Sequence, residues 1–336
     1  MRTQRRTALL AGTVAVVLVS TSCGAAGAGG SADERPLRLA LNQSEDHPSY
    51  TALAHFDTYL QEHTEDLGLD IYANETLGGQ AEVLQLVSSG SVDMAIVSGA
   101  QLENLNQDFT AFNLPRVFDD IDHQMEVVHD PEITGELYSS LEEAHDLRVV
   151  GGFTQGRRSV YTADGPVETP EDLHGANLRV QESPLNVAIA EALGGSAAPM
   201  QYGELYTGLQ SGVVDAAENN EVSYYTQGHY EVAPYWSYTD HLVGLDYLIV
   251  NAGTFEAMNE EERAAFDQGW TAAHEEHAVL WAQATEEAIE GAEAGGATFT
   301  EVDDAAFDAA LGDLVDEFIE TDVQQELHDA AREAAE

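Results

Sequence analysis

The chain has 336 residues, of which 61 are acidic and only 12 are basic, and its formal net charge is −49. Such a charge repels nucleic acid and excludes recognition through a basic patch. Because 43% of the residues are hydrophobic, we still expect a folded core, with the acidic side chains dispersed over a solvated surface that suits high salt.

The first 22 residues differ from the rest. Three arginines precede TALLAGTVAVVLVSTS, an apolar run without acidic residues that is typical of an export signal. At about 16 residues the run is shorter than the roughly 20 that a membrane-spanning helix needs. We therefore expect residues 1–22 to be a signal peptide and the mature chain to be exported.

Cys23 follows this run directly and is the one cysteine in the sequence. The segment VSTSC resembles a bacterial lipoprotein signal, in which the cysteine is lipidated and becomes the first mature residue. Ser20 departs from that pattern, which usually has an aliphatic residue there. We expect lipidation at Cys23, the alternative being ordinary cleavage that leaves a free cysteine. The Gly- and Ala-rich start of residues 23–35 predicts a flexible tether.

The mature chain then alternates strands and helices. The residue composition predicts strands at 36–43, 69–75 and 92–98. Apolar residues at helical spacing predict helices at 48–66 and 79–89. This alternation predicts an α/β fold with parallel strands.

The second half repeats the order. Capped helices are predicted after Thr169 and after Ser183, with a strand at 177–181 between them. The order helix, Ser-Gly, strand occurs at 86–97 and again at 208–219. We therefore expect two related α/β lobes.

A long helix is predicted from Asn259 to about Ala294. Asn259 and Glu262 form a capping box, and apolar side chains follow at helical spacing. About 36 residues at 1.5 Å each span roughly 54 Å. Since one lobe does not need such length, we expect this helix to run across both lobes.

The sequence has no nucleophile-elbow, phosphate-loop, dinucleotide-binding or cysteine-based metal motif. His274 and His277 are three residues apart, whereas the zinc-protease pattern needs a spacing of four. We therefore expect no enzymatic activity, no cofactor and no metal.

Arg179 lies between Leu178 and Val180 in the strand predicted at 177–181. An unpaired guanidinium is costly to bury, so we expect an anionic partner. That partner is either a carboxylate of this acidic chain or the carboxylate of a ligand, which arginine can bind with two hydrogen bonds.

The residues around Arg179 resemble a known family. Within 168–219 the order is T-P-E-D-L-x-G, L-R-V, S-P, Pro-Met, G-E-L-Y-T-x-L-Q-x-G-V-V-D and Glu-Asn; DHPSY, NLPRVF and GHYEVAPYWSYTDH extend the agreement along the mature chain. This set is similar to the solute-binding subunits of TRAP transporters, the tripartite ATP-independent importers of organic acids. The resemblance implies a periplasmic-binding-protein-like fold with a ligand cleft between two lobes and a long helix spanning both.

The resemblance also implies roles for individual residues. Arg179 matches the arginine that grips the substrate carboxylate, and Asn219 matches an asparagine that hydrogen-bonds the ligand. Arg158 is expected to be the second cation, with Arg157 as the alternative. Residues 216–217 are Ala-Ala where the family commonly has Gly-Gln, so the chain departs from the family pattern shortly before Asn219.

Four more residues are candidates. Tyr202 stands where the family places an aromatic ring against the ligand, although a packing role is the alternative. Ser98, Asn42 and Gln43 lie at the ends of predicted strands, where open α/β sheets bind ligands.

We expect lobe I to comprise 36–155 and 245–284, and lobe II 156–244 and 285–336. The expected function is to capture a small organic acid anion and deliver it to a TRAP membrane permease. The alternatives are an ABC-type receptor, a lipid-anchored sensor ectodomain, and a TRAP receptor for a zwitterion such as ectoine. Two cations would suit a dicarboxylate, and one carboxylate clamp with polar groups would suit a uronate, an aldonate or a keto acid.

Overall fold

The computed structural model describes residues 35–335. The predicted signal peptide, Cys23 and the tether up to residue 34 lie outside the described residues. Among residues 35–335, every helix is too short or too polar to cross a lipid bilayer.

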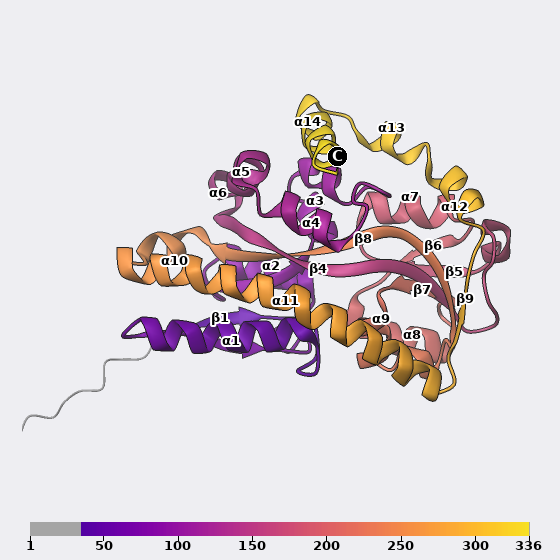
Figure 1. Cartoon of the computed structure of the whole chain (residues 1–336), viewed down its shortest axis with the longest axis horizontal. Coiled ribbons are helices and arrows are strands. Elements are labelled where there is room, and N and C mark those ends of the chain that lie inside the picture. Colours follow the sequence, from indigo (N-terminus) through magenta and orange to yellow (C-terminus); the bar gives the residue numbers. More distant parts are fainter. Residues whose placement is uncertain (1–34, 336) are drawn as a thin grey trace, which may run out of the picture. The chain divides into compact units, whose positions relative to one another are not determined.

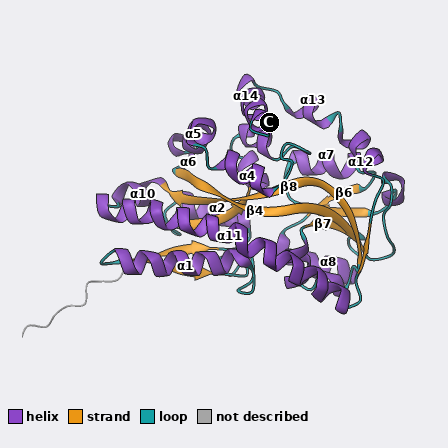
Figure 2. Cartoon of the chain, viewed as in Figure 1, coloured by secondary structure: helices purple, strands orange, loops and turns teal. Residues whose placement is uncertain are grey.

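One mixed sheet organises the described residues, in the order β2-β1-β3-β8-β4-β7-β5-β6, with β9 paired to β8 (Figure 2). The strands are β1 (Arg35–Ala40), β2 (Leu67–Tyr72), β3 (Met94–Ser98), β4 (Leu147–Thr162), β5 (Asn177–Val180), β6 (Ser196–Pro199), β7 (Ala216–Asn219), β8 (Tyr235–Asn251) and β9 (Thr298–Thr300). Strands β1–β3 form a first parallel group and β5–β7 a second. The α/β prediction is confirmed for both groups.

The helices connect and cover these strands. The α-helices are α1 (Pro48–His63), α2 (Gln80–Ser88), α3 (Gly99–Glu103), α4 (Ile121–Val128), α5 (Pro131–Ser139), α6 (Glu142–His145), α7 (Pro184–Ala192), α8 (Leu205–Ser211), α9 (Glu221–Thr226), α10 (Ala252–Ala257), α11 (Glu260–Ala294), α12 (Asp304–Leu311), α13 (Leu314–Phe318) and α14 (Asp322–Glu333). Short 3₁₀ helices are η1 (Gln107–Phe112), η2 (Pro170–Leu173), η3 (Tyr202–Glu204) and η4 (His229–Glu231). The expected caps are present, since Ser183 accepts a hydrogen bond from Asn186 N–H at the start of α7.

The long strands β4 and β8 join the two groups; they run antiparallel to each other, β8 runs antiparallel to β3, and β4 runs antiparallel to β7. The expectation of a parallel sheet is wrong for these two strands. Neither was predicted, because glycine and charged residues interrupt the apolar pattern of β4, LRVVGGFTQGRRSVYT. Their shared ladder shifts register between Thr154 and Arg157, where Gly156 has φ +64°. Both strands therefore bend at this point.

Each face of the first strand group is covered by an apolar core. On β3, Met94 and Ile96 belong to the core beneath α1 and α11, whereas Ala95 and Val97 belong to the core beneath α2 and α4. A strand buried on both faces reads as a continuous apolar run, which is why β3 was predicted.

Helix α11 begins at a capping box of Asn259 and Glu262, as predicted. It packs first along α1 and then against α9, as Figure 1 shows. Trp281 lies between these two contacts, where its indole covers Gly156 at the bend of β4. The helix therefore reaches elements next to both strand groups, as expected for a helix that spans two lobes.

The division into lobes at residues 155 and 244 stays a prediction. Both positions fall close to the register shift of the β4–β8 ladder. Helix α14, which the division assigns to lobe II, packs on η1, which it assigns to lobe I; Gln324 donates a 2.8 Å hydrogen bond to the carbonyl of Gln107.

We expect Trp281→Ala to lower the free energy of unfolding by about 3–5 kcal/mol, because it empties a fully packed site over the bend of β4. Val279→Ala, two residues away on the same helix, is the control, since Val279 is 60% exposed whereas Trp281 is 2% exposed. Urea denaturation followed by circular dichroism measures both variants. Equal losses for the two variants would contradict the packing role of Trp281.

Candidate functional site

The ends of strands from both groups meet at one cavity. It is lined by the seven predicted residues and three glutamines: Asn42, Gln43, Gln80, Ser98, Gln155, Arg158, Arg179, Gln181, Tyr202 and Asn219. The strands β1, β3, β5 and β7 each end at or just before one of these residues, so the sheet topology brings together side chains that lie far apart in sequence. Their role in binding remains a prediction.

Arg179 is buried on β5, with 3% of its surface exposed. Its Nε and Nη2 atoms donate hydrogen bonds of 3.0 and 2.8 Å to the carbonyl oxygen of Met200. No carboxylate within residues 35–335 accepts a hydrogen bond from it, so its Nη1 edge is free to donate into the cavity. Burial lowers the pKa of Arg179, yet an arginine remains protonated in proteins. The guanidinium is therefore a buried positive charge without a direct carboxylate partner in the described chain.

Arg158 is also 3% exposed, but it has a carboxylate partner. Its Nε and Nη2 atoms donate to the two carboxylate oxygens of Glu218 on β7, at 2.6 and 2.8 Å. Its Nη1 atom donates to Oε1 of Gln155. Burial alone would raise the pKa of Glu218, but the adjacent Arg158 guanidinium and His241 lower it to about 2. The pair is therefore ionised, and Glu218 offsets the charge of Arg158.

The alternative arginine, Arg157, points to a different surface. Its side chain is 40% exposed, and its Nη2 atom donates a 2.6 Å hydrogen bond to the carbonyl of Asp119. The sequence left open which of the two arginines faces the cavity, and in the structure it is Arg158.

Two of the other predicted residues are oriented by hydrogen bonds. Oδ1 of Asn219 accepts from the N–H and the side chain of Asn220, at 2.9 and 3.1 Å, which leaves the Asn219 amide nitrogen as a free donor. The hydroxyl of Tyr202 donates to Oε1 of Gln43 at 3.2 Å. Tyr202 therefore links the two sides of the cavity and borders it, so its position also agrees with the packing role considered as the alternative.

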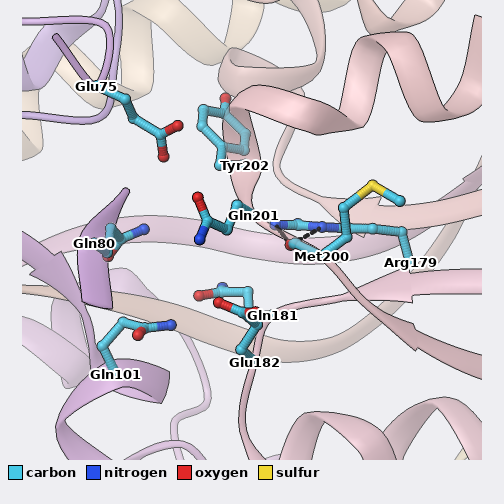
Figure 3. Close-up of a pocket in the computed structure, with 9 residues that line it drawn as sticks. All are labelled: Glu75, Gln80, Gln101, Arg179, Gln181, Glu182, Met200, Gln201 and Tyr202. Atoms are coloured by element: carbon cyan, nitrogen blue, oxygen red, sulfur yellow. Dashed lines mark hydrogen bonds between the residues drawn. The ribbon is translucent and has the colours of Figure 1, made fainter. Parts of the chain in front are cut away.

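The cavity lies between elements of the two strand groups. Figure 3 shows the adjoining pocket, which shares Gln80, Arg179, Gln181 and Tyr202 with the cavity. Glu75, Gln80 and Gln101 lie on one side of it, and Arg179, Gln181 and Tyr202 on the other. Besides the Tyr202–Gln43 bond, Gly203 N–H donates to Glu75 at 3.1 Å and Asn104 donates to the carbonyl of Glu182 at 2.8 Å.

These contacts hold the two sides close together. The cavity is partly open and offers about 20 Å³, room for a water molecule, so binding of a larger ligand requires the two sides to separate.

Several residues of the site were not predicted. Gln80, Gln155 and Gln181 line the cavity, and the carboxylate of Glu218 holds Arg158. Glu218 precedes Asn219 in the sequence, but its contact with Arg158 depends on the pairing of β4 with β7. Nothing in the local sequence around the three glutamines distinguishes them from surface residues.

A larger groove of about 650 Å³ lies away from these residues, between α5, α10 and α11. Its two arginines already have intramolecular partners. Arg148 forms a 3.1 Å salt bridge with Glu142, and Arg263 donates to the carbonyl of Phe255 near the end of α10. The groove therefore has no free cation comparable to Arg179.

Residues 39–322 match the family model of bacterial extracellular solute-binding proteins, family 7. The chain is 34% identical over 276 residues to a solute-binding protein of Chromohalobacter salexigens, and the match covers 82% of each protein.

Solved structures agree in fold. A TRAP periplasmic solute-binding protein from Anaerococcus prevotii with bound D-glucuronate is 37% identical, with a TM-score of 0.86; the match covers 89% of this chain and 97% of that chain. Another from C. salexigens, also with bound D-glucuronate, is 32% identical, with a TM-score of 0.84 and coverage of 89% and 99%. The expected two-lobe fold with a cleft between the lobes is thus confirmed. The chain belongs to the bacterial extracellular solute-binding proteins of family 7, the solute receptors of TRAP transporters.

Proposed function

We propose that this protein binds a uronate, a sugar acid with one carboxylate, and delivers it to a TRAP membrane permease. The observation that carries the proposal is the buried Arg179, which lines the cavity and has no carboxylate partner and no hydrogen bond from Nη1 among the described residues. Arginine binds a carboxylate with two charge-assisted hydrogen bonds.

The charges favour a monocarboxylate over a dicarboxylate. Two cations line the cavity, but Glu218 offsets Arg158 through two short hydrogen bonds. One free cation then remains, and a second ligand carboxylate would be buried without a partner, which is costly. Arg158 still has one N–H on Nη1 that can add a hydrogen bond to the ligand.

The rest of the lining suits hydroxyl groups. Amide side chains dominate it: Asn42, Gln43, Gln80, Gln155, Gln181 and Asn219. An amide can both donate and accept, as the ring hydroxyls of a sugar require. Two similar structures hold D-glucuronate, which agrees with this chemistry.

The other candidates fit less well. A zwitterion such as ectoine would need groups for its cationic end, yet Tyr202 is the one aromatic residue among the ten that line this cavity in the described chain. The family match disfavours an ABC-type receptor and supplies no support for a sensor ectodomain.

We also propose attachment to the outer side of the cell membrane through lipidated Cys23. The support is the sequence alone: an apolar run of signal-peptide length ends directly before this cysteine, and Gly- and Ala-rich residues follow it. A tether of that composition would let the receptor reach its permease while staying at the membrane.

Arg179→Ala should abolish D-glucuronate and D-galacturonate binding, because it removes the free cation. Arg157→Ala is the matched control, since that arginine faces another surface, and it should bind as the wild type does. Isothermal titration calorimetry and thermal shift measure this, with a ligand at 100 times its Kd adding about 2.7 kcal/mol of stability. Equal effects of the two substitutions, or a wild type that binds neither uronate, would overturn the proposal.

Glu218→Gln should lower the free energy of unfolding at pH 7 by about 3 kcal/mol, because it leaves Arg158 buried without its counter-charge. The pKa of Glu218 falls from 4.5 to about 2 on folding. Its ionised form therefore stabilises the fold above pH 4.5, and this contribution disappears as the pH falls toward 2.

The measurement for Glu218→Gln is urea unfolding at pH 7 and at pH 3. We expect the difference between wild type and variant to be smaller at pH 3. Asp119→Asn, which breaks the exposed Arg332 pair, is the control and should change stability by less than about 1 kcal/mol. A difference that is the same at both pH values would show that Glu218 does not act through its charge.

Cys23→Ser should release the exported protein from the membrane fraction, because serine cannot carry the lipid. Fractionation of cells that express the full chain, followed by immunoblotting, measures this. Ser20→Ala, which keeps the cysteine, is the control and should remain membrane-bound. If the serine variant stays in the membrane fraction, the anchor is elsewhere.

A further inference from the structure

A second buried carboxylate, Asp246, lies beside the cavity and was not among the predicted site residues. It is 2% exposed and sits on β8 between Ser98 of β3 and Phe153 of β4 in the sheet register. Among the described residues its one hydrogen-bond donor is the side-chain amide of Gln155. Gln155 and Ser98 both line the cavity, so Asp246 is one side chain removed from a bound ligand.

Asp246 is connected to the cations through Gln155. That side chain donates to Asp246 with its nitrogen and accepts from Arg158 with its oxygen. Asp246 itself makes no ion pair in the part of the chain that the structure describes. In contrast, both carboxylate oxygens of Glu218 are held by Arg158. Of the two carboxylates, Asp246 is therefore the one that can gain a proton without breaking an ion pair.

The two carboxylates, when ionised, balance the charges of the two arginines at the cavity. Of the charged and titratable groups nearby, Arg158 and Tyr202 interact directly with Asp246. Glu218 and His241 adjoin Arg158, and Arg179 interacts with Glu218. On the other side His277 stacks on Phe153, the register partner of Asp246, and interacts with His47. Burial keeps His47 and His277 neutral by lowering the pKa of each. When Glu218 and Asp246 are both ionised, they offset the two arginines. A ligand anion would then add an uncompensated charge in a poorly solvated place.

We propose that Asp246 sets how much negative charge the cavity accepts, taking up a proton when a monoanion binds and, while ionised, disfavouring dianions. This inference rests on the proposed function, because it concerns the charge of the same ligand. It agrees with the effect of burial, which raises the pKa of Asp246 to about 6. A ligand carboxylate nearby raises that pKa further, since like charges favour the protonated form.

The test compares two ligands with the same six-carbon skeleton, D-glucuronate with one carboxylate and D-glucarate with two. Asp246→Asn removes the charge while keeping the shape and the oxygen that accepts from Gln155. We expect the ratio of glucarate to glucuronate affinity at pH 7.5 to rise roughly tenfold in this variant. Asp240→Asn is the control, because it makes the same change on the same strand outside the cavity, and its ratio should match the wild type.

A second measurement uses the unmodified protein, so it does not depend on folding of the variant. Titration of D-glucuronate at pH 6.5 in phosphate and in imidazole, which differ in ionisation enthalpy, counts the protons taken up. We expect roughly half a proton per ligand for the wild type and for Asp240→Asn, and none for Asp246→Asn.

The outcomes separate the two proposals. A wild type that binds neither sugar acid would overturn the proposed function. Uronate binding without proton uptake, or an affinity ratio that is the same in Asp246→Asn and Asp240→Asn, would overturn the role of Asp246 and leave the uronate receptor intact.

Discussion

The ion pair between Arg158 and Glu218 is the interaction on which the site depends. Its two hydrogen bonds cross from β4 to β7, so they tie the long connecting strand to the second strand group at the floor of the cavity. Breaking one partner of such a pair leaves a buried charge, which is far more costly than forming the pair is favourable. The pair therefore fixes the position of Arg158 in the cavity and offsets its charge. Arg179 is left as the cation that is available to an anionic ligand.

Local patterns were sufficient to predict much of the fold. Strand β3 was recognisable because both of its faces are buried, and α11 because its capping box and helical spacing are local features. Strands β4 and β8 were missed for a physical reason. Along each strand the residues contribute in turn to a bend, to the surroundings of the cavity and to three different cores, so neither strand has a single periodicity along its length.

The candidate site, like the fold, was predictable only in part. Arg179 was identifiable because a cation within an apolar strand needs a special reason. The family resemblance located Arg158, Tyr202 and Asn219, and the ends of predicted strands located Asn42, Gln43 and Ser98. The partners of those residues were not identifiable. Glu218 among 61 acidic residues, and Gln155 beside two arginines, acquire their roles only when β4 pairs with β7 and β8.

The contacts that close the cavity, from Tyr202 to Gln43 and from Gly203 to Glu75, involve groups at its edge rather than the free cation. They stabilise a form into which a sugar cannot fit, so this form competes with the ligand. If only a fraction of the molecules is open at any time, the apparent Kd is the intrinsic Kd divided by that fraction. Substitution of Glu75, which is not among the ten residues that line the cavity, would thus change the apparent affinity without altering any of those side chains. The conformational equilibrium would then set the affinity, and the side chains that line the cavity would separately set the selectivity.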